Sequence, residues 1–267
     1  MVDLTPILHH AGPWLMVLFR LSGLFLLTPV LGSATIPRYV KALLVVGLSL
    51  AVYGSLIAPG TPSAAHLDAV RFAELTIWVL LPLAAMELMI GYMIGYGVTL
   101  PIVGLQAGGE IVNQQMGLGI AGAYNPELDD QSGAIGQLLF LLGIAIFLMI
   151  GGHLQVMRVL LDTFGHVPVG GMTAMSSVVE LMLGLLSSMM DILIKVAAPV
   201  LTLLFLESVA MGFITRTVPQ IQILSVGFAI RILIAVAMLM VTVAAVVAVG
   251  EEAIHDALRQ IKFLLAP

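Results

Sequence analysis

The stretch ILSVGFAIRILIAVAMLMVTVAAVVAV, residues 223–249, is apolar along its whole length apart from Arg231 and two hydroxyl side chains. A helix needs about 20 consecutive apolar residues to cross the hydrocarbon core of a bilayer. In lipid a helix satisfies its own backbone hydrogen bonds, so a run of this length predicts a membrane helix. This stretch sets the fold class, and the rest of the chain has the same character.

The composition points to a membrane protein. The chain has 267 residues, of which 60% are hydrophobic and 9% charged, and its mean hydropathy is +1.14. A soluble domain of this length carries roughly 25% charged residues. The net charge of −5 is spread thinly, and no Lys/Arg cluster indicates nucleic-acid binding. The chain has no Cys, which excludes disulfides, zinc-thiolate sites and thiol catalysis.

Six apolar windows predict an all-α fold of about six long helical segments in one domain, residues 1–267. The third and fifth windows are too long for one span, and we expect each to bend or break at its prolines, because proline removes a backbone donor. The tail, residues 251–267, spaces its apolar residues as one face of a short amphipathic helix, expected in the membrane interface or on a partner. The N-terminus has no basic region before its first apolar run and is expected to be uncleaved. The windows are 13–31, 40–58, 75–105, 134–150, 178–214 and 223–249, and the tail face is Ile254, Leu258 and Ile261.

Charged residues lie inside these windows, at Arg20, Glu87, Lys195, Glu207 and Arg231. A charge at mid-bilayer costs about 2.5–3.5 kcal/mol on insertion scales and is normally shielded by protein or water. The chain is therefore a poor candidate for a bundle that stands alone in lipid.

One polar, glycine-rich stretch interrupts the apolar sequence: QAGGEIVNQQMGLGIAGAYNPELDDQS, residues 106–132. Its Gly117, Gly119 and Gly122 satisfy the G-x-G-x-x-G pattern of dinucleotide-binding proteins. That fingerprint requires a preceding strand and a following helix, whereas here an apolar helix precedes it and Asn125-Pro126 follows. Nucleotide binding is rejected.

Two further patterns have a structural interpretation. Glu87, Gly91 and Gly95 recur every four residues on one helical face, which is typical of close helix packing. A proton relay at Glu87 would need other ionisable groups in reach, so a paired structural carboxylate is favoured. The six His residues are dispersed, no metal-binding spacing or catalytic signature is present, and neither an enzyme nor a cofactor is expected.

Five motifs, in this order and at these spacings, resemble the FliR family of flagellar export-gate proteins and its injectisome relatives. The resemblance runs from about residue 14 to residue 250. The chain departs from the family pattern at Gly109, at Asp-Thr-Phe 162–164, at Ile-Gln-Ile 221–223 and in the acidic residues 127–132. The motifs are Arg20 and Pro29 before IPRYVK (36–41), ELMIGYMIGY (87–96), AGGEIVNQQMGLGIAGAYNP (107–126), GGHLQVMRVLLDTFGHVPVG (151–170) and APVLTLLFLESVAMGFITRTVPQIQIL (198–224).

The resemblance implies a non-enzymatic, multi-pass protein of the bacterial inner membrane and flagellar basal body. In this family one copy joins FliP and FliQ subunits in a helical gate that contacts FlhB and FlhA. Unfolded flagellar export substrates pass through the gate, and the helices are surrounded largely by protein as well as membrane lipid. No nucleic acid and no cofactor are implied.

The family's loop after Gln-Met-Gly projects into the channel as a plug, and its Met residues form a seal. We therefore expect the pore gate in residues 106–132. The glycines would supply flexibility, Met116 and Ile120 would seal the pore, and the polar residues would lie near the constriction. The expected gate residues are Glu110, Gln114, Gln115, Met116, Gly117, Gly119, Ile120, Gly122, Asn125 and Pro126.

A second set of residues is expected to pack between subunits, although local helix capping is an alternative for the corner at Arg216, Pro219 and Gln220. Two other functions remain open: an injectisome export-gate homologue, and a small-solute secondary transporter with Glu87 and Glu207 as ion-coupling carboxylates. The expected packing residues are Arg20, Glu87, Gly91, Gly95, His153, Arg216, Pro219 and Gln220.

Overall fold

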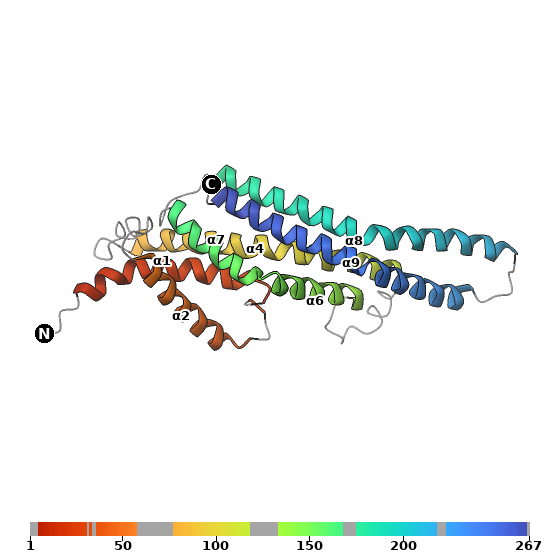
Figure 1. Ribbon diagram of the computed structural model, residues 1–267, viewed down its shortest axis with the longest axis horizontal. Coiled ribbons are helices and arrows are strands. Elements are labelled where there is room, and N and C mark those ends of the chain that lie inside the picture. The colour runs from red at the N-terminus through yellow and green to blue at the C-terminus, as the bar shows by residue number, and fades with distance from the viewer. Residues whose placement is uncertain are drawn as a thin grey trace. The chain divides into compact units, whose positions relative to one another are not determined.

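The computed structural model is all-helical over the residues it describes, and it contains seven helices there (Figure 1). The helices are α1 (Thr5–Leu27), α2 (Arg38–Leu56), α4 (Ile77–Gln115), α6 (Ala134–Met149), α7 (Gly152–His166), α8 (Met175–Thr217) and α9 (Ile223–Leu265). The structure describes residues 5–30, 32–33, 36–57, 77–117, 133–167, 175–217 and 223–265.

Five of these helices are long and apolar enough to cross a membrane, and the pair α6 and α7, bent by 65° at its break, would make a sixth. The all-α prediction with about six apolar segments is confirmed. The apolar parts of α4, α8 and α9 cover 37 to 39 residues each. At 1.5 Å per residue this is almost 60 Å, about twice the 30 Å of a hydrocarbon core.

Two local predictions differ from the structure. Helices α4 and α8 are continuous, so neither breaks at Pro82, Pro101 or Pro199, whereas a bend at these prolines stays a prediction. Neighbouring helices can satisfy the backbone groups that a proline frees in such a helix. Helix α7 had no predicted counterpart, because its apolar residues form one buried stripe among polar ones. It begins directly after Gly151, whose φ of +67° lies in the left-handed region that glycine adopts readily.

The chain divides into two compact units, and the single domain expected from the sequence stays a prediction. Unit 1 comprises residues 1–99, 151–185 and 256–267. In it the second half of α1 packs against α4 (Figure 1), with Gly23 of α1 against Leu88 O of α4 and Gly91 of α4 against Arg20 O of α1. The backbones of the two helices therefore touch where glycines remove the side chains, as the spacing predicts.

The last part of α9, residues 256–265, also belongs to unit 1. Residues 251–265 continue α9 instead of starting a separate helix. Ile254, Leu258 and Ile261 of the predicted apolar face are buried within the chain. A Cβ at Gly97 of α4 would lie 2.7 Å from Ile261 Cδ1, and Lys262 Nζ pairs with Asp162 Oδ2 of α7 at 3.0 Å. In this chain the tail is thus a packed helix end.

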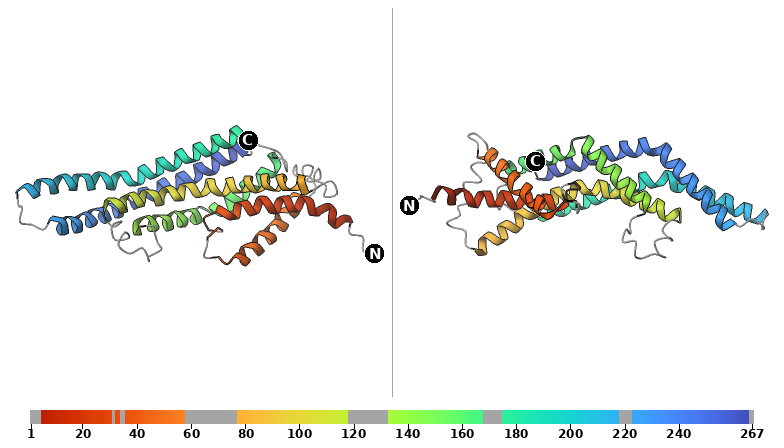
Figure 2. Two further views of the ribbon diagram at one scale, coloured as in Figure 1. Left: turned by 180° about the vertical axis from the view of Figure 1, so that it is seen from behind. Right: turned by 90° about the horizontal axis from the view of Figure 1, so that it is seen from below.

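Unit 2 comprises residues 100–150 and 186–255. In it α8 and α9 run side by side as an antiparallel pair (Figures 1 and 2). Their core with the end of α4 is formed by Val112, Met116, Ala197, Val200, Leu204 and Ala235. The apolar windows of α8 and α9 are only 28% and 11% buried, so most of their apolar surface is uncovered in the single chain.

Candidate functional site

The polar stretch 106–132 begins on the last turns of α4. The helix ends after Gln115, where Met116 N–H donates to Val112 O at 2.9 Å and Gly117 N–H donates to Gln114 O at 3.0 Å. Gly117 has a φ of +82°, a left-handed conformation that commonly terminates helices and that glycine adopts without a steric penalty. The chain therefore leaves the helix at the first of the three glycines singled out in the sequence.

The other end of the stretch returns to the same helix. Gly133, directly before α6, donates its backbone N–H to Glu110 Oε2 of α4 at 2.7 Å. The side-chain amide of Asn113 lies against Gly133, at a position where any Cβ would overlap it. Glu110 and Asn113 on α4 thus hold the residue at which the chain re-enters a helix.

The remaining predicted gate residues have different surroundings. Met116 is 1% exposed, in the core that α4 shares with α8 and α9, while Gln114 and Gln115 are exposed. Their contribution to sealing a pore stays a prediction. Gly119, Ile120, Gly122, Asn125 and Pro126 lie outside the described residues.

Arg20 and Glu87 form a fully buried ion pair in unit 1. Arg20 Nε donates to Glu87 Oε2 at 2.5 Å, Nη1 donates to Thr163 Oγ1 at 3.2 Å, and the guanidinium lies 4.0 Å from the centre of the Phe164 ring. Glu87 is thus a paired carboxylate, as the sequence interpretation expects. The site joins α1, α4 and α7, and packing of these residues against other subunits stays a prediction.

A second ion pair lies between α8 and α9. Arg231 Nε donates to Glu207 Oε2 at 3.1 Å, and Arg231 Nη2 donates to Ser208 Oγ at 2.9 Å. The Glu207 side chain is 4% exposed and that of Arg231 34%. Both carboxylates of the transporter alternative, Glu87 and Glu207, therefore already pair with an arginine.

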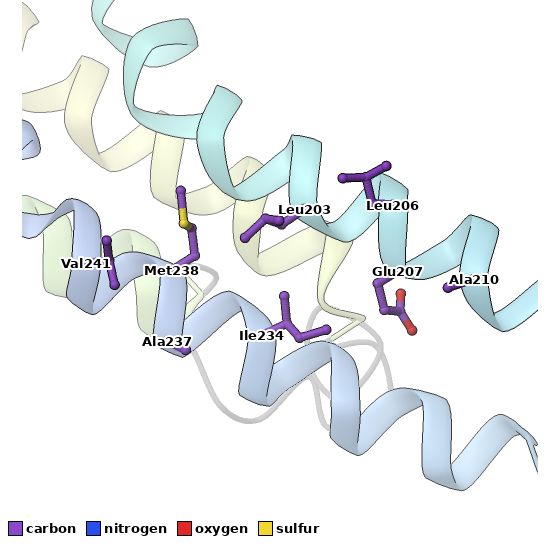
Figure 3. A pocket seen from close by; sticks show the side chains of 8 residues that line it. All are labelled: Leu203, Leu206, Glu207, Ala210, Ile234, Ala237, Met238 and Val241. Carbon is purple, nitrogen blue, oxygen red and sulfur yellow. The ribbon is translucent and has the colours of Figure 1, made fainter.

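Beside this pair α8 and α9 form an open apolar groove of about 540 Å³ (Figure 3). Figure 3 shows Glu207 among aliphatic side chains from both helices, with Ala210 beyond it on α8. The groove is lined by Leu203, Leu206, Glu207 and Ala210 of α8 and by Ile234, Ala237, Met238 and Val241 of α9.

The other predicted packing residues do not gather at one place. Gly91 and Gly95 contact α1 within the chain, whereas His153 and Arg216 are exposed on α7 and α8. Pro219 and Gln220 lie outside the described residues. Among the described residues no group of three or more His, Cys, Asp or Glu side chains is arranged to hold a metal ion.

Sequence reasoning missed Asn113, Gly133, Thr163 and Phe164. Asn113 stands three residues after Glu110, a spacing that places both on one face of a helix. That spacing was the available signal for the contact with Gly133. No sequence pattern predicts the hydrogen bond between Arg20 and Thr163. The two residues are 143 positions apart and meet only when the helices pack.

Comparison with known proteins gives one family and several relatives. The model of the family described as "Bacterial export proteins, family 1" matches residues 11–257. The chain is 27% identical to flagellar biosynthetic protein FliR of Escherichia coli (strain K12) over 223 residues, which are 83% of this chain and 80% of the relative. It is 24% identical to FliR of Bacillus subtilis over 99% of this chain and 96% of the relative. It is 28% identical to Yop proteins translocation protein T of Yersinia pestis over 64% of this chain and 66% of the relative.

Proposed function

This chain belongs to the bacterial export proteins, family 1, and we propose that it is a non-enzymatic component of the flagellar type III export channel. The observation that carries the proposal is the family match over residues 11–257, together with relatives that bear the name FliR. In this role the chain helps to pass unfolded flagellar subunits across the inner membrane while the flagellum is assembled.

The membrane location follows from the helices. Several of them are apolar enough to span a bilayer, and family membership makes the chain a multi-pass membrane protein of an export apparatus. The finer location, the bacterial inner membrane at the flagellar basal body, is part of the proposal. Localisation of a fluorescent fusion to the cell envelope at sites of basal bodies tests it.

The partners in this proposal are FliP and FliQ subunits, with FlhB and FlhA in contact with the assembled gate. The exposed apolar surface of α8 and α9 supports such an assembly, because their apolar windows are longer than a bilayer is thick. Co-expression with FliP and FliQ followed by native mass spectrometry should give a complex that contains this chain. A chain that stays monomeric under these conditions contradicts the proposal.

Residues 106–132 are proposed as the gate. The support is that the stretch is polar and rich in glycine, and that Gly133, directly after it, donates its N–H to Glu110 near its start. Irregular backbone at membrane depth is tolerated where it is enclosed by protein or lines a water-filled cavity. Deletion of residues 118–130 should make the assembled complex leak small ions, and unchanged permeability would exclude the gate.

An injectisome role is the second candidate, because the Yersinia relative is as similar in identity as the flagellar ones. Complementation distinguishes the two. Expression in a strain that lacks its own FliR should restore swimming, whereas an injectisome component should restore secretion in a strain that lacks translocation protein T.

A further inference from the structure

We propose that the exposed side of α2 and the first turns of α4 face membrane lipid, and that Arg38, at the start of α2, binds the phosphate of an anionic phospholipid. The inference rests on the membrane location in the proposed function and not on the flagellar role. It concerns unit 1 alone, to which both segments belong. In the assembled export complex this surface stays in lipid, whereas α8 and α9 contact other subunits.

Helix α2 has the length of one membrane span. Its 19 residues rise about 28 Å at 1.5 Å per residue, close to the thickness of about 30 Å of a hydrocarbon core. The apolar parts of α8 and α9 cover 39 and 37 residues and are about twice as long as such a core. A bilayer can therefore cover the whole of α2 but only part of α8 or α9.

One side of α2 packs on α1, and the other side is uncovered. In Figure 1 no other helix of unit 1 lies on the far side of α2 from α1. The uncovered side carries large apolar side chains at intervals of three and four residues, the spacing of one helical face. Lys41 is the last charged residue of the helix, so the rest of this side matches hydrocarbon. The buried residues are Val45, Ser49, Val52, Tyr53 and Leu56, and the exposed apolar ones are Tyr39, Leu43, Val46 and Leu50.

The contacts with α1 fix the directions of α2 and α4. His10 of α1 is hydrogen-bonded to Tyr53 of α2, and Trp14, one turn later on α1, donates to Ser49, one turn earlier on α2. The two helices are therefore antiparallel. The glycine contacts of α4 with α1 advance along both helices together, so α4 is parallel to α1. Helix α4 thus begins at the end of unit 1 where α2 finishes.

Exposed aromatic side chains stand at both ends of this surface. Tyr39, at the start of α2, is 78% exposed, and Trp78, at the start of α4, is 83% exposed. Because α4 begins where α2 finishes, Tyr39 and Trp78 lie at opposite ends. Tyr and Trp are enriched at the two interfaces between a membrane and water. Met89 continues the exposed apolar surface on α4. The aromatic residues therefore mark the two boundaries of a lipid layer.

The basic residues of this surface gather at the end marked by Tyr39. Arg38 is exposed, and within the described ranges no carboxylate forms an ion pair with it. Lys41 lies one turn later and donates from Nζ to Gly32 O at 2.9 Å. A guanidinium matches a phosphate with two parallel hydrogen bonds, and cations close to a membrane surface attract anionic lipids. Arg38 thus lies where the headgroup of a lipid packed on α2 would be.

Helix α7 sets a limit to the lipid-facing surface. Arg158 is exposed on α7, and Asp162 of the same helix pairs with Lys262 at 3.0 Å. Charged side chains in hydrocarbon are costly and normally face protein or water. By contrast, Arg20 and Glu87 are the only charged residues of α1 and of α4 up to residue 99, and both are buried. Lipid therefore covers unit 1 on α2 and the start of α4, and not on α7.

The first test measures what covers α2 in the assembled complex. The chain has no Cys, so Leu43→Cys carries a single nitroxide spin label, in complex with cysteine-free FliP and FliQ in lipid vesicles. Oxygen concentrates in the hydrocarbon, whereas a chelated nickel complex stays in water. The label at Leu43→Cys should collide with oxygen several-fold more often than with nickel. Low collision rates with both reagents would mean that protein covers α2, and this result would overturn the inference.

Leu233→Cys on α9 is the matched control. Leu233 is 69% exposed and Leu43 is 73% exposed in the single chain, so the two labels start from similar surroundings. On assembly the oxygen collisions of Leu233→Cys should fall several-fold, while those of Leu43→Cys should stay unchanged. An equal fall at both positions would place α2, like α9, against another subunit.

The second test concerns the phosphate. The full chain is purified from vesicles that contain equal amounts of phosphatidylcholine and phosphatidylglycerol, and native mass spectrometry counts the lipids that it retains. Arg38→Gln should retain several-fold less phosphatidylglycerol than the unaltered chain, with phosphatidylcholine unchanged. Arg259→Gln is the control, because Arg259 is exposed but already pairs with Asp256. Equal retention by Arg38→Gln and the unaltered chain would exclude Arg38 as a phosphate ligand.

The same samples separate failure of this inference from failure of the proposed function. If native mass spectrometry detects no complex with FliP and FliQ, the proposed function fails. The label at Leu43→Cys in vesicles of the chain alone then decides the inference. High oxygen and low nickel collision rates there support lipid on α2, whereas frequent collisions with nickel would place α2 in water and reject it.

Discussion

Arg20 and Glu87 stand 67 residues apart in the sequence and form an ion pair in which neither side chain reaches solvent. The carboxylate lies on α4 and the guanidinium on α1, beside Thr163 and Phe164 of α7. A buried charge is tolerated when it is paired and hydrogen-bonded. The pair therefore fixes which faces of three helices meet inside unit 1.

Removing one member of this pair should destabilise the protein strongly. Arg20→Met leaves the Glu87 carboxylate buried without its partner, which typically costs about 3–5 kcal/mol. The double variant Arg20→Met/Glu87→Leu should be more stable than Arg20→Met, because no isolated charge remains. Thermal unfolding of the purified chain in detergent measures the stability of the single and the double variant.

The exposed pair on α8 is the control for this prediction. Lys195 Nζ pairs with Asp191 Oδ2 at 2.6 Å, with 53% and 60% of the two side chains exposed. Exposed pairs contribute only about 0–1 kcal/mol, so Lys195→Met should be nearly neutral. Equal losses in Arg20→Met and Lys195→Met would mean that burial of the first pair does not matter.

Gly91→Ala should disrupt the contact between α1 and α4. The added methyl group would meet the backbone of Arg20 and Leu24, which cannot move aside as a flexible side chain can. Overpacking of this kind costs about 1–3 kcal/mol or more. Gly47→Ala on α2 meets no atom within 4 Å and should be neutral or stabilising by up to about 1 kcal/mol, because Ala favours a helix. If the two variants unfold at the same temperature, the helices do not pack through Gly91.

Gly117→Ala should weaken the end of α4. A left-handed conformation costs a residue with a Cβ about 1–2 kcal/mol, and Asn tolerates it better than Ala. The Cβ would also lie 3.1 Å from Phe228 Cε2. Because Ala and Asn both carry a Cβ, a higher unfolding temperature for Gly117→Asn than for Gly117→Ala isolates the conformational part. A lower unfolding temperature for Gly117→Asn than for Gly117→Ala would mean that the loss of stability comes from packing on Phe228.

Assembly should cover the exposed face of α9. The sequence contains no Cys, so single cysteines report cleanly on access of a small maleimide that enters detergent and lipid. Leu233 is 69% exposed, whereas Ala235 of the same helix is fully buried. Leu233→Cys should react rapidly in the isolated chain and several-fold more slowly in complex with FliP and FliQ, while Ala235→Cys should react slowly in both. An unchanged rate for Leu233→Cys in the intact complex would exclude this face from the contact with those subunits.

The sequence alone determined the helical membrane class, the approximate place of most helices and the family resemblance. These depend on local properties: runs of apolar residues, the spacing of Gly91 and Gly95, and short motifs in order. It did not indicate α7, whose buried stripe becomes visible only with the helices it packs against. It also suggested that α4 and α8 bend or break at their prolines, and the break is wrong, because the proline rule ignores neighbours that stabilise a long helix.

The contacts between residues distant along the chain follow from the packing of the helices. The sequence gives Glu87 a structural role but cannot say that Arg20 and Thr163 surround it, because residues distant along the chain meet only when helices pack. The stretch 106–132 likewise stood out by its polarity, yet the contact of Asn113 with Gly133 depends on how closely α4 approaches α6. Polarity is a property of single residues and can be read in sequence, whereas close approach depends on the volumes of both surfaces and appears only in the fold.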